Sequence, residues 1–490
     1  MRILLAQNLI HLPSHGGANK SNRILMEHLA ARGHDVHVVA PLSGALRTGP
    51  DGAGAEDLIR RGARLVETGG PGEAGSSGEA GAPGETGGPC EIARSGGTGG
   101  PGETGGPGEV VYSYRGVTVH AVTEPHLLAR RVAEVAGRLA PDWTLVPSDD
   151  PGLIVLGAAL RATPDRVVYL VHTLQQLPFG PGAFYPSAAG TRMVRRAAGV
   201  VAVSRAAQDY CRRHASLEST LIYPHIYDHP PDDPTSPGPY VTMINPCGYK
   251  GLPIFLGLAD ACPGIAFLAV PTWGTTEAER AELARRPNIT IMPPADDVHE
   301  ILRRTRILLM PSLWDETFGY ACVEAMLSGV PVLASDTGGL AEAKLGVPYL
   351  LPVRPVERYE AAGHARPVPV VPEQDLGPWL AALRRLTDDP HHHADLAARS
   401  RQAARTFTAG LKRDALETYL TGLAPPPPSP LAQRRRAALA SLAAARAIPE
   451  RAGPERAGPE GVGAEGAGRE EADAEGAGSE GRAVAEGRAR

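Results

Sequence analysis

Two glutamates, Glu316 and Glu324, stand eight positions apart in residues 311–329, PSLWDETFGYACVEAMLSG. The apolar run RILLM precedes this segment, and the apolar spacing that follows predicts a helix beginning near Phe318 or Gly319. Glu316 would then lie just ahead of the positive end of the helix, and Glu324 more than one turn inside it. The two carboxylates could therefore bind different parts of one elongated ligand.

The start of this helix is suited to bind oxygen atoms of a ligand. Gly319 lets a ligand approach the backbone closely, and the N–H groups of a first helical turn suit anionic or hydroxyl oxygens. Further along the chain, Gly338-Gly339 precedes Glu342. We expect this glycine pair to form a second permissive turn beside the first.

Apolar runs and amphipathic segments alternate along the chain and predict repeated strand–helix units. The first unit contains a loop at 8–22 and a helix from Arg23 to Arg32. The alternation restarts at residue 240 and continues to about residue 400. We therefore expect an α/β protein with two doubly wound Rossmann-like domains, whose ligand binds at the carboxyl ends of the strands.

Two segments are too rich in Gly, Pro and Glu to form a packed core. Residues 69–109 and 449–490 are nearly devoid of large apolar side chains, in a chain of 490 residues with 58 Gly and 47 Pro. Such segments bury too little apolar area to offset the entropy lost on folding, so we expect them to be disordered. The predicted organisation is an N-terminal domain at 1–228 with a disordered insertion at 69–109, a Pro-rich linker at 229–239, a C-terminal domain at 240–403, a helix at 404–423, and a linker with a disordered tail at 424–490.

Charge and cysteine usage argue against several classes of protein. The net charge is −5; the two low-complexity segments contribute −9 and the four Arg of residues 424–448 add +4, so the remaining body is close to neutral. This argues against a nucleic-acid-binding or membrane-coating surface. Five cysteines without a C-x-x-C pair favour a reduced, cytoplasmic protein over a disulfide framework or a zinc site. We expect no signal peptide and no transmembrane span, since no run of 18 apolar residues occurs.

The segment around Glu316 and Glu324 resembles the E-x7-E signature of the retaining glycosyltransferases of family four, within the glycosyl transferases group 1. Members of that family have the GT-B fold, in which two Rossmann-like domains face a central cleft. The resemblance extends from Met1 to about Leu423, apart from the insertion. Its other features, in family order, are the Gly16-Gly17 loop, His172 at a strand end, the VAVS segment ending at Ser204, and Lys250-Gly251.

The resemblance implies roles for the residues of the C-terminal domain. Glu324 would hold the ribose hydroxyls of a nucleotide-sugar donor, and Glu316 would face the transferred sugar. Backbone groups of Thr317, Phe318 and Gly319 would contact that sugar or the diphosphate.

The remaining predicted contacts flank the same donor. Gly16 and Gly17 would lie against the distal phosphate, and His172 would contact the donor sugar. Lys250 lies near the end of a predicted strand, where its charge could stabilise the departing diphosphate. Five residues before this lysine the family usually has an arginine, whereas this chain has Asn245.

We expect no metal ion and no cofactor, with the nucleotide diphosphate sugar as co-substrate. Lys20 or Arg23 could replace the missing arginine. His391-His392-His393 is interpreted as a loop that leads into a helix from Ala394. The acidic pairs are interpreted as turns rather than metal ligands; they are 149–150, 232–233, 296–297 and 388–389.

A finer resemblance points to family-four enzymes of actinobacterial secondary metabolism. It rests on the strings VHTLQQLPFGPGAFYP, NPCGYKGLPIFLGLAD, VPTWGTT and PVVPEQDLGPW. The acceptor would then be a small molecule or a glycoside, bound by the N-terminal half near Leu174–Tyr185. The aromatic residues Phe179, Phe184 and Tyr185 could contact an aglycone or simply pack the domain.

Two alternatives to a glycosyltransferase remain open. The same fold hosts sugar-nucleotide epimerases. A catalytically silent nucleotide-sugar-binding scaffold is the second alternative, because Asn245 replaces the usual arginine. The intact pair Glu316 and Glu324 argues against a silent protein.

Overall fold

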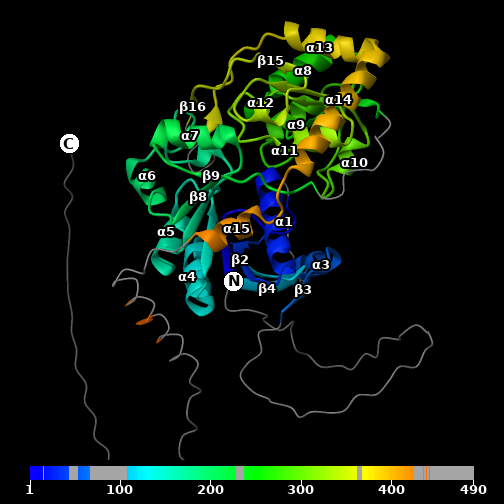
Figure 1. The fold of residues 1–490 in the computed structure, drawn as a ribbon. Helices are drawn as coiled ribbons and strands as arrows, with labels where there is room; N and C mark the ends of the chain where they lie inside the picture. Colours follow the sequence, from blue (N-terminus) through cyan, green and yellow to red (C-terminus); the bar gives the residue numbers. More distant parts are fainter. Residues whose placement is uncertain are drawn as a thin grey trace, which may run out of the picture. The chain divides into compact units, whose positions relative to one another are not determined.

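Two sheets built from successive strand–helix units organise the two halves of the chain (Figure 1). The computed structural model describes residues 1–14, 16–42, 53–66, 108–227, 237–360 and 367–423, with residues 434, 437, 438 and 441. Most of the predicted insertion, linker and tail therefore lies outside the described residues. Residues Met1–Ala443 form one compact unit that contains both sheets.

The first sheet belongs to the N-terminal half. Its strands lie in the spatial order β3 (Arg64–Leu65), β4 (Glu109–Tyr114), β5 (Val117–Val122), β2 (Asp35–Pro41), β1 (Arg2–Ala6), β6 (Trp143–Pro147), β7 (Val167–Val171), β8 (Gly199–Ala202) and β9 (Thr220–Leu221). All neighbours pair in parallel except β3–β4 and β4–β5. Glu109 is buried and pairs with Val122, so the predicted insertion ends before residue 109.

The helices of the N-terminal half follow the strands in the order expected for a doubly wound domain. They are α1 (Gly17–Ala31), α3 (Ala53–Arg60), α4 (Leu128–Leu139), α5 (Ile154–Ala162), α6 (Ala188–Val194) and α7 (Arg205–Ala215).

The second sheet is parallel throughout. Its order is β12 (Ile289–Ile291), β11 (Phe267–Val270), β10 (Tyr240–Ile244), β13 (Thr305–Met310), β14 (Val332–Ser335) and β15 (Leu350–Leu351). Its helices are α8 (Leu252–Ala261), α9 (Glu277–Ala284), α10 (His299–Leu302), α11 (Tyr320–Leu327), α12 (Leu340–Ala343), α13 (Gly377–Asp388) and α14 (Pro390–Ala409), and a small hairpin joins β16 (Tyr359–Glu360) to β17 (Val368–Pro369). Within the described residues, no helix is long and apolar enough to span a membrane.

In each sheet the order in which strands are added reverses at the first strand of the domain, β1 or β10. The chain leaves β1 toward β2 on one side and later places β6 on the other, and β10 lies in the same way between β11 and β13. Loops that follow the strands at such a switch point diverge and leave a crevice between them. The segments after β1, β6, β10 and β13 are therefore the ones that the fold brings to a ligand.

Helix α1 begins six residues earlier than predicted, at Gly17 instead of Arg23. Its first turns are polar but buried: Asn19, Ser21 and Asn22 are each at most 3% exposed. The Nδ2 atom of Asn22 donates to Gln7 Oε1 at 3.1 Å. Polar residues on the inward face hid the helical period, so the segment was wrongly predicted to be a loop.

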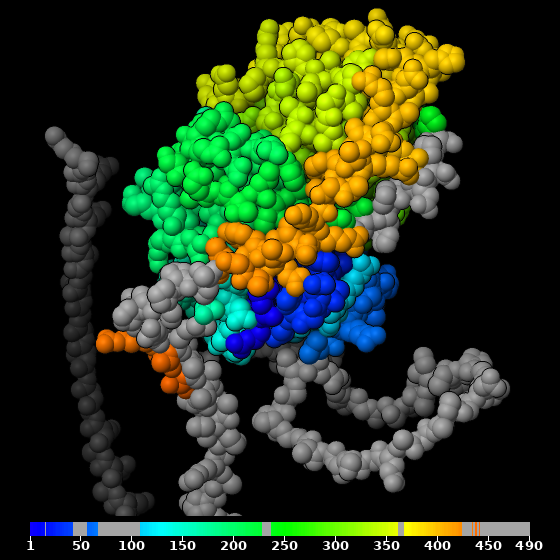
Figure 2. Space-filling view, viewed as in Figure 1, coloured from blue at the N-terminus to red at the C-terminus, as the bar shows by residue number. Residues whose placement is uncertain are grey.

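The end of the described chain differs from the prediction of one helix at 404–423. Helix α14 already begins at Pro390, because Asp389 caps it through a hydrogen bond from the His392 N–H at 2.9 Å. His391-His392-His393 therefore lies in the first helical turn and not in a loop. After a break, α15 (Ala415–Gly422) packs Leu416 and Leu420 against the core of the first sheet. Figure 2 shows this segment in orange beside the blue N-terminal residues. An ion pair joins the two segments, with Arg32 Nε 3.0 Å from Glu417 Oε2.

A buried lysine lies beneath the C-terminal sheet. Lys344 follows α12, has no exposed side-chain surface, and donates from Nζ to the backbone oxygen of Val332 at 2.7 Å. Burial lowers the pKa of Lys344 from 10.5 to about 8. Between these two values the unfolded chain binds the proton that the folded chain releases, so this group makes the fold more stable as pH rises.

We expect the stability of the wild type relative to Lys344→Met to rise by up to about 3 kcal/mol between pH 8 and 10.5. Thermal melts of both proteins across this range measure the difference. Lys412→Met, at an exposed lysine, is the matched control and should show no such trend. A Lys344→Met difference that stays constant with pH would contradict the prediction.

Candidate active site

A cavity of about 330 Å³ lies at the carboxyl ends of both sheets. It collects residues from the loops after β1, β7, β10 and β13. Glu324 does not line it. The other nine predicted site residues do: Gly16, Gly17, His172, Asn245, Lys250, Glu316, Thr317, Phe318 and Gly319.

Two helix amino termini from opposite domains face this cavity. Helix α1 is capped by Gly16 and α11 by Gly319, so no N-cap side chain covers their first-turn N–H groups. Neither first turn contains an acidic residue. A Cβ atom on Gly17 would lie 2.3 Å from Cδ2 of Tyr320, so the two helix ends meet through a glycine. Both dipoles are therefore aimed at a region suited to an anion.

The loop that carries Glu316 is held from the N-terminal domain. Gln175 Nε2 donates to the backbone oxygen of Asp315 at 2.9 Å, and Ser204 Oγ donates to that of Thr317. Ser204 also caps α7 by accepting from the Ala207 N–H at 3.0 Å.

The predicted second glycine turn packs directly on the same loop. The Gly339 N–H donates to the backbone oxygen of Glu316 at 2.6 Å. A Cβ on Gly338, which has φ +50°, would lie 2.4 Å from that oxygen. Only a turn without side chains can approach the loop this closely.

Lys250 and Glu316 form an ion pair at the cavity wall. The same Glu316 oxygen, Oε1, accepts from Ser312 Oγ. Lys250 Nζ also lies 4.7 Å from the centroid of the Trp314 ring, within the range of a cation–π contact. The lysine is thus held beside the carboxylate, with both groups facing the cavity.

A second lysine–glutamate pair links the two domains. Lys20 on α1 places Nζ 2.5 Å from Glu324 Oε1 on α11. Arg23, by contrast, donates to Ser14 Oγ at 2.7 Å and to Glu27 Oε1 at 2.6 Å. Lys20 therefore stands closer to the motif than Arg23, but it contacts Glu324 and not the position of the missing arginine.

Asn245 positions the loop after β11. Its Oδ1 atom accepts from the Gly274 N–H at 3.0 Å, and its backbone has φ +60°. Trp273 in this loop lines the cavity, is 45% exposed and stacks on Trp314 with ring centroids 6.1 Å apart. Sequence reasoning missed Trp273, although an aromatic residue just after a central strand was a usable signal.

The aromatic residues of the expected acceptor loop differ in their surroundings. Phe184 lines the cavity and contacts Tyr249, Trp314 and Tyr359 with ring centroids 5.3–6.3 Å apart. Phe179 is buried against Tyr210. Of the two alternatives, Phe184 fits a ligand contact and Phe179 fits packing.

His172 lies at the end of β7 with 7% of its surface exposed. Ser148 Oγ accepts from the backbone N–H groups of His172 and Thr173, at 2.9 and 3.0 Å. Burial lowers the pKa of the His172 imidazole to about 4, so the ring is neutral at pH 7. Its Nδ1 atom has no hydrogen-bond partner among the described residues.

The interpretation of the acidic pair 149–150 as a turn was wrong for Asp149, which lines the cavity. Asp150 does serve local structure, since its Oδ2 accepts from the Val155 N–H at 2.6 Å at the start of α5. Asp149 lines the cavity, and its Oδ2 accepts from the N–H groups of Asn8 and Leu9, both at 3.1 Å. Its Oδ1 finds no partner within the described part of the chain. A carboxylate directly after a switch-point strand was the overlooked signal.

No group of three or more His, Cys, Asp or Glu side chains in the described ranges is placed to hold a metal ion. The absence of a metal from the reaction stays a prediction.

Residues 260–362 match the family model described as Glycosyl transferases group 1. A 2-deoxystreptamine glucosyltransferase of Streptomyces kanamyceticus is 36% identical over 151 residues, which cover 29% of this chain and 38% of that protein. A D-inositol 3-phosphate glycosyltransferase of Rhodococcus erythropolis is 31% identical over 146 residues, 28% of each chain. The predicted resemblance to the group 1 glycosyltransferases is confirmed. The alignments span less than two-fifths of these relatives.

Solved glycosyltransferase structures share the fold over most of the chain. The HepE protein of Anabaena, solved with UDP and glucose, has a TM-score of 0.54 at 18% identity and covers 86% of this chain and 100% of its own. The TarM protein of S. aureus, solved with UDP among its ligands, has a TM-score of 0.55 at 9% identity with the same coverage. The GT-B fold is therefore confirmed.

The group 1 match covers only part of the cavity. It includes Glu316 and the residues that follow it to Gly319, whereas Gly16, Gly17 and Lys250 lie outside residues 260–362. Geometry, rather than the family match, brings these residues to the same cavity.

Asp149 should make stability depend on pH. Burial is the main cause that raises the pKa of Asp149 from 3.8 to about 8. The folded chain therefore keeps a proton that the unfolded chain releases between these values, and stability falls as pH rises through this window. Asp149→Asn removes the titration, so the variant should gain several degrees in Tm relative to wild type between pH 5 and 8.

Thermal melts at pH 5, 6, 7 and 8 provide the measurement. Asp209→Asn, at an exposed position on α7, is the control and should follow the wild type. Parallel curves for wild type and Asp149→Asn would show that Asp149 is ionised in the fold.

Proposed function

We propose that this protein is a retaining glycosyltransferase that transfers a sugar from a nucleotide diphosphate sugar to a small-molecule or glycoside acceptor. The observation that carries the proposal is the convergence of two glycine-capped helix amino termini and Lys250 on one cavity. A nucleoside diphosphate leaving group needs this concentration of positive potential. The UDP bound in the structures of HepE and TarM supports UDP as the nucleotide.

The donor would lie with its diphosphate between α1 and α11. Backbone N–H groups near Gly17 and Gly319 would bind phosphate oxygens, and Lys250 would move from Glu316 to the departing phosphate. Glu316 would then be free to orient hydroxyls of the sugar and to stabilise its developing positive charge. These groups would neutralise the diphosphate without a metal ion.

Glu324 would bind the ribose of the donor. Because Lys20 already occupies its Oε1, we propose that the ribose hydroxyls bind the other oxygen or displace the lysine. His172 is uncharged at neutral pH, so it can hydrogen-bond a sugar hydroxyl without repelling an oxocarbenium-like ring. Retention of the anomeric configuration rests on the E-x7-E resemblance.

The acceptor would enter beside the N-terminal domain. Asp149, Gln175 and Phe184 line the cavity on that side and offer hydrogen bonds and one aromatic face. The names of the relatives, a 2-deoxystreptamine and an inositol 3-phosphate enzyme, support a small polyhydroxylated acceptor. A cytoplasmic location fits the free, buried state of all four described cysteines.

The proposal is tested by incubating the full chain with UDP-, GDP- and ADP-sugars, with and without small cyclitol and aminoglycoside acceptors. We expect nucleotide release and an acceptor glycoside with the donor's anomeric configuration by NMR, undiminished in EDTA. Donor binding without turnover would favour the scaffold alternative, and an epimerised donor would favour the epimerase. An inverted product would exclude retention.

Lys250→Ala should lower turnover by about 10²-fold while changing Tm little, because the charge acts on the leaving group and Glu316 keeps its hydrogen bond from Ser312 when the lysine is removed. Initial rates and melts measured in parallel separate the two effects. Arg130→Ala, which removes a cation from an exposed ion pair on α4, should leave turnover unchanged. A Lys250→Ala enzyme with near-normal turnover would place the diphosphate elsewhere.

The two glutamates should give different kinetic signatures. Glu324→Gln weakens a contact to ribose hydroxyls that do not change during transfer, so donor KM should rise with kcat nearly unaltered. Glu316→Gln removes charge beside the reacting ring, so kcat should fall by about 10²–10³. Steady-state kinetics with one donor distinguish the two, and exchanged signatures would mean that the donor lies in the opposite direction.

A further inference from the structure

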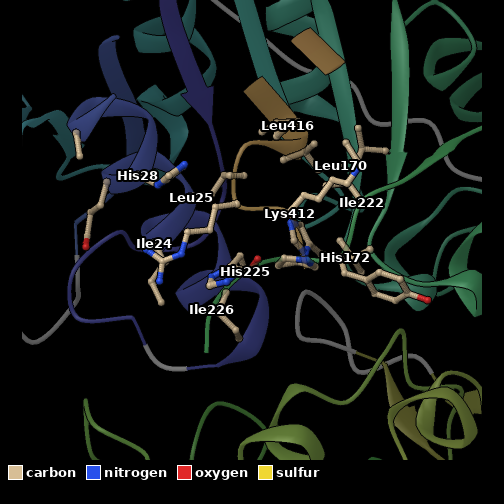
Figure 3. Close-up of a pocket in the computed structure, with 18 of the residues that line it drawn as sticks. Ile24, Leu25, His28, Leu170, His172, Ile222, His225, Ile226, Lys412 and Leu416 are labelled. Carbon is tan, nitrogen blue, oxygen red and sulfur yellow. The ribbon is translucent and has the colours of Figure 1, made fainter. Parts of the chain in front are cut away.

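A second cavity, of about 300 Å³, shares His172 with the candidate active site (Figure 3). Arg115, in the turn between β4 and β5, lines it, and four elements form the rest of its walls: helix α1, the ends of β7 and β8, residues 222–226, and residues 412–416. We call it the hinge cavity, because residues 222–226 and 412–416 belong to the two interdomain connections of the chain. Residues 222–226 leave the first sheet toward β10, and residues 412–416 return from α14 to α15.

The hinge cavity is mainly apolar. A volume of this size corresponds to about ten water molecules, and hence to a ligand of roughly ten heavy atoms. The aliphatic wall residues come from all four elements and are Ile24, Leu25, Leu170, Val201, Ile222, Ile226 and Leu416.

Two buried ring nitrogens mark places for a polar group of the ligand. His172 lines both cavities, and its Nδ1 has no partner among the residues that the structure describes. His28 Nε2 is also buried, and no partner for it occurs in the described ranges. A wholly apolar occupant would leave both atoms without hydrogen bonds, which is costly.

The charges around the hinge cavity favour an anion. Lys412 and Arg413 both line it. Among the described lining residues the one acid is Glu27, which already bonds Arg23 at 2.6 Å and Arg115 at 3.1 Å. A carboxylate on the ligand would therefore meet more positive than negative charge.

We propose that the hinge cavity binds a small apolar carboxylate, with its hydrocarbon or aromatic body against the aliphatic wall and its carboxylate toward Lys412 and the Nδ1 atom of His172, which lacks a partner within the described residues. Because both interdomain connections line the cavity, the ligand alters the approach of α1 to α11. It therefore changes nucleotide affinity, and this second part rests on the proposed function.

Calorimetric titration of the full chain with 4-phenylbutyrate, without nucleotide, tests the site itself. We expect saturable binding of one molecule, weakened at least tenfold by Leu25→Trp, which fills the cavity. Lys412→Glu should weaken 4-phenylbutyrate about threefold to tenfold but leave the uncharged 4-phenylbutanol unchanged. Arg130→Glu, an equal charge reversal on α4 away from the cavity, is the matched control and should bind like the wild type.

Two outcomes would overturn the proposed site: no saturable binding, or binding that Leu25→Trp leaves intact while the variant melts like the wild type. If Leu25→Trp fails to fold, the Lys412→Glu comparison still decides, since equal affinity of that variant and wild type for the carboxylate excludes the assigned orientation.

The coupling is tested separately by UDP titration at saturating 4-phenylbutyrate. A change of at least threefold in the UDP Kd supports it, and linkage requires the same factor in the reverse titration. An unchanged UDP Kd overturns the coupling. Failure of UDP to bind at all would count against the proposed function, while the first titration would still establish the hinge cavity.

Discussion

The meeting of α1 with α11 is the contact on which the candidate site depends. Gly17 has no room for a side chain against Tyr320, so the two helix ends can approach only because that position is glycine. This approach brings two positive helix dipoles to one cavity from separate sheets. Neither sheet alone supplies such a site, since each contributes one helix terminus at its own switch point. The fold therefore serves the chemistry by controlling how closely two glycine-capped helices meet.

Each motif glutamate has a lysine partner, and the two pairs differ in what they connect. Lys250 and Glu316 both belong to the C-terminal domain and face the cavity, so their pairing keeps the charges balanced until an anion binds. Lys20 and Glu324 join the two domains, so their pairing helps to hold α1 against α11. A ligand that competes for the first pair changes local charge, whereas one that competes for the second also acts on the domain contact. Lys20 thus connects the two domains, whereas an arginine at the position of Asn245 would belong to the C-terminal domain alone.

The strand–helix alternation was sufficient to predict two doubly wound domains, because strands buried on both faces are continuous apolar runs. The alternation did not itself identify Glu316 and Lys250, which were found through the E-x7-E spacing and the family resemblance. It failed where polar residues face inward, as at Asn19 and Asn22 in the first turns of α1, because buried polar side chains leave no apolar period in the sequence. Asp149 was missed for a related reason. A turn and a cavity wall use the same residue type, so the signal that distinguished them was the place of Asp149 directly after the switch-point strand β6.

His172 gives the two cavities a common wall. Its backbone is fixed to the first sheet through Ser148, so the ring belongs to a rigid part of the N-terminal domain. Residues 222–226 and 412–416, on the other side of the hinge cavity, belong to the interdomain connections. Residues of the first sheet and residues of the interdomain connections line the same cavity. Any change in the relative position of the domains would therefore change the shape of this cavity. Helix α1 lines both cavities, so its contact with α11 bears on the space behind His172 as well as on the candidate active site.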